Sequence, residues 1–285
     1  MKNTRLNKKQ NDRDWSMAFV DDSDYDVLYD EDVYVEKPDG SPLLCLRKKA
    51  LSSENTIQAW SVLKDLNLIS RNRGVASGRE NKEINGVHQS AKGWEVCSGI
   101  IGYFERTVRM PFCRACAWNL KHPDKFEKLL PMVREVNDLF KQSVPERHRI
   151  QSLHVDKTTK DFVIPGTVFT TLTVNKNFRT ACHKDAGDLE DGFSCLSVIR
   201  KGVYKGGNLV LPAWRIAVKL DTYDVVMFDA HEFHGNTQIV PITKDAERCS
   251  VVYYFREAMV RCKSSKEELL RAKNRKRGDS IFEDE

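Results

Sequence analysis

The second half of the chain most constrains the fold, because it is a succession of short β-rich runs. Between Val163 and Phe255, stretches rich in Val, Ile, Leu, Thr, Tyr and Phe alternate with Gly, Asp, Asn and Pro. No helical period of apolar residues separates them, which argues against the crossover helices of a parallel α/β sheet. The pattern predicts an antiparallel sandwich or barrel. We expect strands at Thr167–Val174, Cys195–Ile199, Leu209–Leu211, Val225–Phe228 and Ser250–Phe255.

The first half predicts elements that flank this β-rich core. Apolar residues fall at helical spacing over Ser53–Leu68 and over His122–Phe140, and we expect a helix in each range. The run CSGIIGYF, which begins at Cys97, and the segment Val108–Trp118 have the composition of strands. The chain is therefore expected to be mainly β with flanking helices, an α+β arrangement.

Blocks of charge divide the chain into three expected parts. Residues 1–40 are polar, with basic residues first and acidic residues later, so we expect a loosely ordered segment with one strand at Asp32–Val35. Residues 41–262 should form a single domain with its β core at about 163–256. Residues 263–285 should form a basic helical tail, because SSKEELLRAKNRKRGD begins with a capping sequence.

The net charge and the absence of apolar runs bear on the partners and the location of the protein. The formal net charge of +5 permits a nucleic-acid partner without requiring one. The N-terminus is hydrophilic and no run of about 18 apolar residues occurs, so we expect neither a secretory signal nor a membrane span. The expected location is the cytoplasm.

Eight cysteines are scattered along the chain, and in the cytoplasm we expect their thiols to be reduced. Cys113 and Cys116 form an isolated CxxC pair. Zinc would need two further ligands, so buried free thiols are the default expectation and structural zinc is the alternative.

The segment FRTACHKDAGD carries the most informative chemistry. It holds His183 and Asp185 two residues apart, and alternate residues of an extended segment face one side. A second β-rich segment, about fifty residues later, contains His231 and His234. Two histidines and one carboxylate form the facial triad of non-haem iron oxygenases, which leaves positions open for a 2-oxoacid and dioxygen. We favour His234 as the second histidine, because Gly235-Asn236 would expose it at a strand end, and we expect His231 to lie outside the ligand set.

Arg248 strengthens the iron interpretation. It follows His234 by fourteen residues in RCSVVYYF, and Ser250 faces the same side of the expected strand. A guanidinium fork with a hydroxyl beside it suits a terminal carboxylate. His183, Asp185, His234 and Arg248 therefore predict an oxygenase that uses Fe(II), 2-oxoglutarate and dioxygen.

From about Cys97 to Cys262 the chain resembles the TET/JBP family of nucleic-acid dioxygenases, especially its compact phage and viral members. The resemblance lies in FTTLTVNKNFRTACHKDAGDLEDGFSCLSVI, YKGGNLVLP, HGN and RCSVVYYFRE. It implies a double-stranded β-helix core, a jelly roll, and oxidation of the 5-methyl group of 5-methylcytosine or thymine in DNA to 5-hydroxymethyl. The number of oxidation steps and the choice between DNA and RNA stay open. A viral member would act in the host-cell cytoplasm.

The resemblance also assigns further residues by position. His183, Asp185 and His234 would hold iron, while Arg248 and Ser250 would hold 2-oxoglutarate. The other four assignments are to the co-substrate and the flipped base. Arg114 would reach the co-substrate, and the alternative for it is a surface salt bridge. Tyr254 would stack on the base, and the alternative for it is core packing. Asp188 stands where TET enzymes have a base-contacting asparagine, and Arg256 replaces a base-contacting histidine and would contact a carbonyl or a phosphate.

DNA would also need a basic track. Candidates are in the loop from Ser70 to Gln89 and in the tail: Arg71, Arg73, Arg79, Arg271, Lys273, Arg275, Lys276 and Arg277. Two other functions remain open, namely hydroxylation of a protein side chain or small metabolite, and a non-catalytic jelly-roll binding module.

Overall fold

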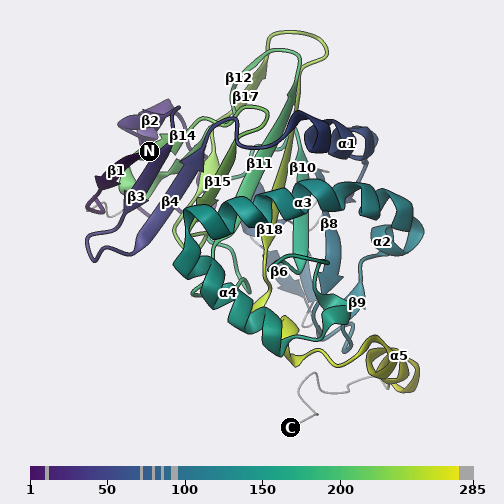
Figure 1. The fold of residues 1–285 in the computed structure, drawn as a ribbon. Coiled ribbons are helices and arrows are strands. Elements are labelled where there is room, and N and C mark those ends of the chain that lie inside the picture. The colour runs from purple at the N-terminus through teal and green to yellow at the C-terminus, as the bar shows by residue number, and fades with distance from the viewer. Residues whose placement is uncertain (10–12, 71–72, 79–80, 85–86, 91–95, 276–285) are drawn as a thin grey trace.

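A sheet of ten strands runs through the centre of the molecule in this computed structural model (Figure 1). The structure describes residues 1–9, 13–70, 73–78, 81–84, 87–90 and 96–275. In spatial order the large sheet contains β1 (Lys2–Arg5), β3 (Val33–Glu36), β4 (Pro42–Arg47), β15 (Val225–Phe228), β11 (Ser194–Lys201), β18 (Glu247–Tyr254), β10 (Thr171–Lys176), β8 (Val96–Phe104) and β5 (Ile69–Ser70), with β9 (Arg114–Ala115) paired to β8.

A second sheet of four strands completes the β core. Its order is β16 (Gly235–Asn236), β13 (Leu209–Leu211), β14 (Ile216–Val218) and β2 (Val27–Tyr29). Two ribbons stand apart from both sheets, β12 (Tyr204–Gly206) with β17 (Ile239–Pro241), and β6 (Asn81–Ile84) with β7 (Val87–Ser90). The strand-rich core with flanking helices confirms the predicted fold class.

Five α-helices accompany these sheets in the described part of the chain, and α3 and α4 cross one face of the large sheet (Figure 1). Their bounds are α1 (Ser53–Leu63), α2 (Ala117–Lys121), α3 (Pro123–Ser143), α4 (Pro145–Lys157) and α5 (Ser265–Asn274). No helix in the described ranges is both long enough and apolar enough to cross a membrane.

Strand β18 separates a helix-covered core from the interior between the two sheets. Cys249, Val251 and Tyr253 are buried in the core that includes residues of α1, α3 and α4. The alternate residues Val252 and Tyr254 face the other way and line a cavity. Because side chains alternate with a period of two, one face of β18 packs in the helix-covered core and the other face lines the cavity. A separate core between the sheets contains Leu196, Val198, Val226 and Phe228 from the large sheet and Leu209, Leu211, Ile216 and Val218 from the small one.

The N-terminal segment is not loosely ordered, as its polar composition had led us to expect. Residues 1–40 contain β1, β2 and β3, so the segment extends both sheets. Val33 and Val35 are fully buried in the core between the sheets. A few well-placed valines therefore outweigh the polarity of the segment as a whole.

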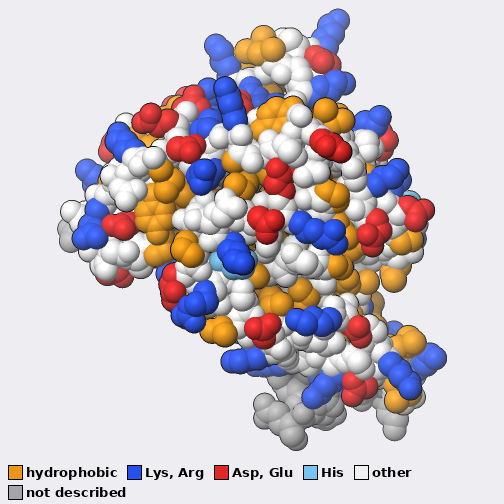
Figure 2. All heavy atoms as spheres, viewed as in Figure 1, with side chains coloured by type: hydrophobic (Ala, Val, Ile, Leu, Met, Phe, Trp, Pro, Cys, Tyr) orange, Lys and Arg blue, Asp and Glu red, His pale blue; other side chains and the backbone are white. Residues whose placement is uncertain are grey.

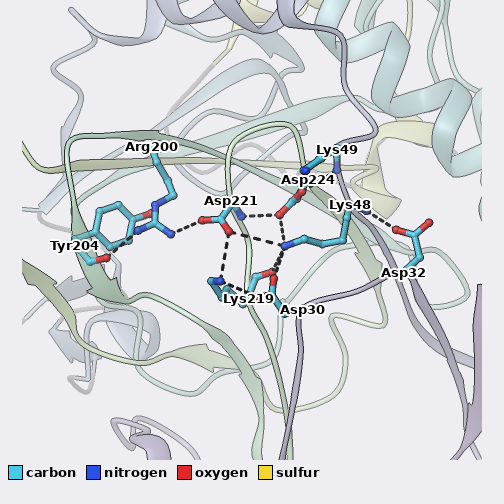
Figure 3. Close-up of polar contacts among 9 residues, drawn as sticks. All are labelled: Asp30, Asp32, Lys48, Lys49, Arg200, Tyr204, Lys219, Asp221 and Asp224. Atoms are coloured by element: carbon cyan, nitrogen blue, oxygen red, sulfur yellow. Dashed lines mark hydrogen bonds and ion pairs between the residues drawn. The ribbon is translucent and has the colours of Figure 1, made fainter.

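A network of charges also attaches this segment to the core (Figure 3). The ammonium of Lys48 lies 2.7 Å from Asp30 and 2.6 Å from the buried carboxylate of Asp224. Burial alone would lower the pKa of Lys48, but the hydrogen bonds to Asp224 and Asp30 outweigh it and raise the pKa. Lys219 contacts the other oxygen of Asp30 at 2.7 Å, so residues before β3, after β4 and after β14 are linked.

The clearest differences from the expected elements are in the first helix and in the segment Val108–Trp118. The first helix ends at Leu63 instead of Leu68, because Asp65 and Asn67 compete for backbone hydrogen bonds and disfavour a helix. The segment Val108–Trp118 pairs as a strand only at Arg114–Ala115. Pro111 lacks the N–H that a ladder needs, and the chain then turns into α2.

Truncation of Val35 tests whether the N-terminal segment belongs to the folded core. Val35→Ala should lower the free energy of unfolding by roughly 1.5–3 kcal/mol, because it removes two buried methyl groups and leaves a cavity. Val27→Ala is the matched control, since Val27 is 42% exposed, and should change that free energy by less than about 0.5 kcal/mol. Urea denaturation measures both, and equal effects would contradict the integration of β3.

Candidate metal and co-substrate site

A short antiparallel bridge of backbone hydrogen bonds joins the segments that carry His183 and His234. The N–H of His183 donates to the carbonyl of His234 at 3.0 Å, and the N–H of His234 donates to the carbonyl of His183 at 2.9 Å. The N–H of Asp185 donates to the carbonyl of Ala230 at 3.0 Å. The backbone therefore places all three side chains together.

Each imidazole is oriented by a carbonyl oxygen. Nδ1 of His183 lies 2.8 Å from the carbonyl of Ala181, and Nδ1 of His234 lies 3.0 Å from the carbonyl of Glu232. A carbonyl can only accept, so both Nδ1 atoms carry a proton and both Nε2 lone pairs are available. The Nε2 atoms of His183 and His234 lie 3.4 and 3.9 Å from carboxylate oxygens of Asp185.

These three side chains fit a divalent transition metal. One ligand atom from each of them lies within 4.8 Å of the others. Two imidazole nitrogens and one carboxylate oxygen are the protein ligands of facial-triad iron sites, which keep further positions open. The described residues contain no second group of this kind.

The electrostatics of the site favour the metal-binding protonation states of His234 and Asp185, whereas burial of His183 is outweighed by the hydrogen bond and the charge of Asp185, which raise the pKa of His183. Burial lowers the pKa of His234 to about 4, and the neighbouring His183 adds to that effect. Burial alone would raise the pKa of Asp185, but the hydrogen bond with His183 and the nearby histidines outweigh it and lower the pKa to about 2. At neutral pH, His234 is therefore a neutral donor and Asp185 an anionic one.

The triad opens into a cavity of about 220 Å³ that is also lined by Arg248 and Ser250. Arg248 is 4% exposed, and no carboxylate among the described residues forms an ion pair with it. Burial lowers the pKa of Arg248. Burial of a guanidinium without a counter-ion has an unfavourable desolvation free energy. An anionic ligand beside Arg248 would offset that unfavourable term.

Two glycines precede the strand that packs against Arg248. Gly207 has a φ of +72°, and a Cβ there would lie 2.9 Å from both Cδ and Nε of Arg248. The motif YKGGN thus provides the space in which the arginine side chain lies. Tyr204, from the same motif, has a buried hydroxyl without a hydrogen-bond partner in the described structure.

Arg73 is a second cavity-lining cation, and sequence reasoning placed it only in a basic track for DNA. Its Nε is buried without a hydrogen-bond partner among the described residues. Burial lowers the pKa of Arg73, and the proximity of Tyr254 and Asp185 opposes that change. The carbonyl of Ala76 accepts a hydrogen bond from the N–H of Ala181 at 2.8 Å, which holds the segment after Arg73 against the strand that leads to His183. No spacing rule connects this loop arginine with the triad.

The comparison with protein families agrees with this geometry. The model named Tet_JBP, described as the oxygenase domain of the 2OGFeDO superfamily, matches residues 99–257. This range is more than half of the chain and includes the triad and Arg248. The chain belongs to the Tet_JBP family.

Similar proteins lie in the same family. The chain is 35% identical over 167 residues to Thymine dioxygenase JBP1 of Leishmania braziliensis and 37% identical over 168 residues to that of Crithidia fasciculata. Each match covers 57% of this chain and 20% of the relative, so the chain spans about a fifth of their length. The solved structure titled "NgTET1 in complex with 5mC DNA in space group P3221" shares the fold, with a TM-score of 0.62 and 16% identity over 95% of this chain and 90% of that one.

Within this Tet_JBP domain, the three residues expected to contact substrate all line the cavity, namely Asp188, Tyr254 and Arg256. Tyr254 is buried, and its hydroxyl lies 3.0 Å from the hydroxyl of Thr173. Asp188 is 9% exposed and accepts a hydrogen bond from the hydroxyl of Ser194 at 3.3 Å. Burial and the negative charge of Asp185 raise the pKa of Asp188 well above its usual range. A carboxyl group that is protonated can both donate and accept hydrogen bonds, whereas an ionised carboxylate can only accept.

The two remaining arginines lie differently. Arg256 lines the cavity but forms a two-point ion pair with Glu105. Arg114 does not reach the cavity; its guanidinium stacks on Phe104 at 4.9 Å and donates to the carbonyls of Glu105 and Phe112. The structure therefore does not support a direct co-substrate contact for Arg114, and its predicted alternative, a salt bridge, does not form either among the described residues.

His231 lies outside the metal-ligand group, as we expected. Its Nδ1 is 3.3 Å from a carboxylate oxygen of Asp229, which also contacts Lys37 at 2.7 Å. The neighbouring carboxylate of Asp229 raises the pKa of His231.

The expectation of free thiols is wrong for two cysteines. Cys113 and Cys262 form a disulfide, although 149 positions separate them. Cys116 is a free buried thiol that accepts a hydrogen bond from the N–H of Asn119 and caps α2. The CxxC pair therefore does not act together, and the described residues give it no zinc site.

The expected basic track is only partly described. Arg71, Arg79, Lys276 and Arg277 lie outside the described residues. Arg73 lines the cavity, while Arg271, Lys273 and Arg275 lie on α5 or directly after it.

Substitution of the two nearby histidines tests the ligand assignment. His234→Ala should weaken binding of Fe(II), or of Mn(II) as a redox-stable substitute, by at least about 100-fold, because one of three protein ligands is lost. His231→Ala should change metal affinity by less than about threefold, because the ring of His231 pairs with Asp229. Equilibrium dialysis with metal analysis measures both, and retention of metal by His234→Ala would contradict the assignment.

Proposed function

We propose that this domain is an Fe(II)- and 2-oxoglutarate-dependent dioxygenase that oxidises the 5-methyl group of a pyrimidine base in DNA. One observation supports it most: an open His-Asp-His face shares a cavity with the buried, unpaired guanidinium of Arg248. A metal chelator with a distant carboxylate satisfies both features at once. Fe(II) and 2-oxoglutarate have these properties.

Charge also favours a dianionic co-substrate. Arg248 and Arg73 both line the cavity, and neither has an ion-pair partner among the described residues. 2-Oxoglutarate carries two carboxylates. Arg248, with Ser250 beside it, would hold the carboxylate far from the metal, while Arg73, which lies near Asp185, would balance the charge at the metal end. In this assignment Arg73 takes the role that the family resemblance implies for Arg114.

The substrate side of the cavity is formed by Tyr254 and Asp188. A base within a duplex cannot reach a buried metal, so the target nucleotide would be flipped into the cavity. The ring of Tyr254 would stack on the base and the carboxyl group of Asp188 would contact its polar edge. When bound, iron, 2-oxoglutarate and dioxygen would supply the oxidising chemistry: one oxygen atom of O2 would enter the methyl C–H to give C–OH, and the other would leave in succinate as carbon dioxide is released. The chain itself binds, orients and shields the reactants.

The names of the relatives guide the choice of base. The JBP1 relatives are named thymine dioxygenases, and the solved structure of similar fold is titled as a complex with 5mC DNA. Thymine is therefore the first base to test, and 5-methylcytosine is the second.

Matched DNA duplexes test the proposed reaction. The enzyme, with Fe(II) and 2-oxoglutarate, should form 5-hydroxymethyl products in duplexes that contain thymine or 5-methylcytosine, as detected by mass spectrometry of nucleosides. Duplexes of the same sequence with uracil in place of thymine and with unmethylated cytosine provide the control, because they lack the methyl group. Asp185→Ala should form no product. Succinate release that responds to RNA, peptides or metabolites but to none of the methylated duplexes would contradict DNA as the substrate.

Removal of each extra arginine tests the co-substrate assignment. Arg73→Gln should raise the KM for 2-oxoglutarate roughly tenfold or more, because a charge-assisted contact to a carboxylate is lost. Arg114→Gln is the matched control and should leave this KM within about twofold, since its guanidinium stacks on Phe104 outside the cavity. Titration of succinate release against 2-oxoglutarate measures both, and the reverse order of effects would restore the role that the sequence predicted for Arg114.

A further inference from the structure

A loop and a helix beside the cavity form one surface, which we call the rim platform: residues 105–113 together with residues 263–275, which include α5. The platform begins at the cavity, since Glu105 pairs with Arg256, a cavity-lining residue. Arg256 in turn lies beside Gly187, where a Cβ would be 3.4 Å from its guanidinium. Gly187 and its neighbour Ala186 are exposed, so this is where the cavity meets the surface.

The loop and α5 are locked together by buried contacts. Arg106 pairs with Glu268 of α5 at 2.7 Å, and the two side chains are only 8% and 1% exposed. The second carboxylate oxygen of Glu268 accepts a hydrogen bond from the N–H of Cys113 at 2.8 Å. The disulfide between Cys113 and Cys262 joins the same two segments covalently. A helix fixed by a buried ion pair and a disulfide is part of the folded domain and not a loose tail.

The exposed face of the platform is basic. Residues 105–113 and 263–275 contain seven basic and three acidic side chains, while the whole chain has a formal net charge of +5. All three acids serve local structure, because Glu105 pairs with Arg256, Glu268 is buried, and Glu267 accepts hydrogen bonds from Ser264 in the capping box of α5. The exposed basic residues are Arg109, Lys263, Lys266, Lys273 and Arg275. In Figure 2, α5 stands out at the lower right with basic and hydrophobic side chains on its surface.

We propose that the rim platform binds the phosphate backbone of duplex DNA beside the flipped base. This inference rests on the proposed function and adds the surface on which the duplex lies. Exposed cations on segments that are fixed beside a cavity-lining residue are complementary to a polyanion that must place one base inside the cavity. The ten residues of α5 span about 15 Å, close to the rise of four base pairs. Val108 is 83% exposed and offers an apolar contact for a deoxyribose at the same edge.

Charge reversal on the full-length chain tests the proposal. Arg109→Glu combined with Lys273→Glu changes two exposed platform residues. Lys205→Glu combined with Lys244→Glu is the matched control: it alters net charge equally at exposed positions on and beside the β12–β17 ribbon, which projects at the opposite end of the molecule from α5 (Figure 1). The readout is anisotropy of a labelled 20-base-pair duplex, measured over a range of salt concentrations without metal or 2-oxoglutarate.

The platform variant should raise the Kd for duplex DNA roughly tenfold or more and should reduce the slope of log Kd against log salt by about one to two, as expected when phosphate contacts are lost. The control variant should change the Kd by less than about twofold. Both variants should bind Mn(II) and 2-oxoglutarate like the parent protein.

Equal losses in the two variants would overturn the proposal, because they would show a general effect of net charge. An unchanged Kd in the platform variant would also overturn it. If the parent protein binds and oxidises DNA in that case, the proposed function stands and only the platform is wrong. If the parent protein neither binds nor oxidises any duplex, the proposed function fails together with this inference.

Discussion

The reciprocal backbone hydrogen bonds between His183 and His234 are the constraint on which the site depends. They bring residues fifty positions apart into register without help from a metal. Carbonyls then fix each ring through Nδ1, so that both Nε2 atoms point toward Asp185. Because the bridge consists of main-chain groups, side chains around it can change while the ligand geometry is kept. The positions of the three ligand side chains are therefore set mainly by the main chain of the fold.

The second constraint is an imbalance of charge within the cavity. Arg248 is buried there and Arg73 is half-buried, and neither has an ion-pair partner among the described residues, whereas Arg256, at the edge of the same cavity, is neutralised by Glu105. Proteins rarely bury a cation without a partner unless a ligand provides one. The distribution of unpaired guanidinium groups thus indicates where an anion would bind, independently of any resemblance. Gly207 is part of the same arrangement, because a side chain there would collide with Arg248.

The sequence predicted the core better than its surroundings, for reasons visible at particular residues. β13 and β15 have the predicted bounds because all their side chains are apolar. β18 begins at Glu247, three residues before the prediction, because Arg248 is a buried cation that interrupts the apolar pattern. The residue that made the start of the strand hard to predict is therefore the same arginine that lines the cavity. Arg73 and the disulfide of Cys113 with Cys262 could not be predicted, because long-range packing alone brings them into place.

These differences divide the domain into two kinds of structure. Strand β18 supplies Arg248, Ser250 and Tyr254, and its alternation places all three on the side of the cavity. His183 and His234 lie just outside the named strands and are joined by their own backbone bridge. The mouth of the cavity is built from segments outside the strands, including Arg73, Glu105 and the loop that carries Asp188. Such segments have no periodicity to constrain them, so they can vary without disturbing the bridge between the histidines. The bridge between the histidines and the arginine on β18 therefore belong to the β core. The residues around the opening of the cavity, where a substrate would be recognised, come from the less regular segments.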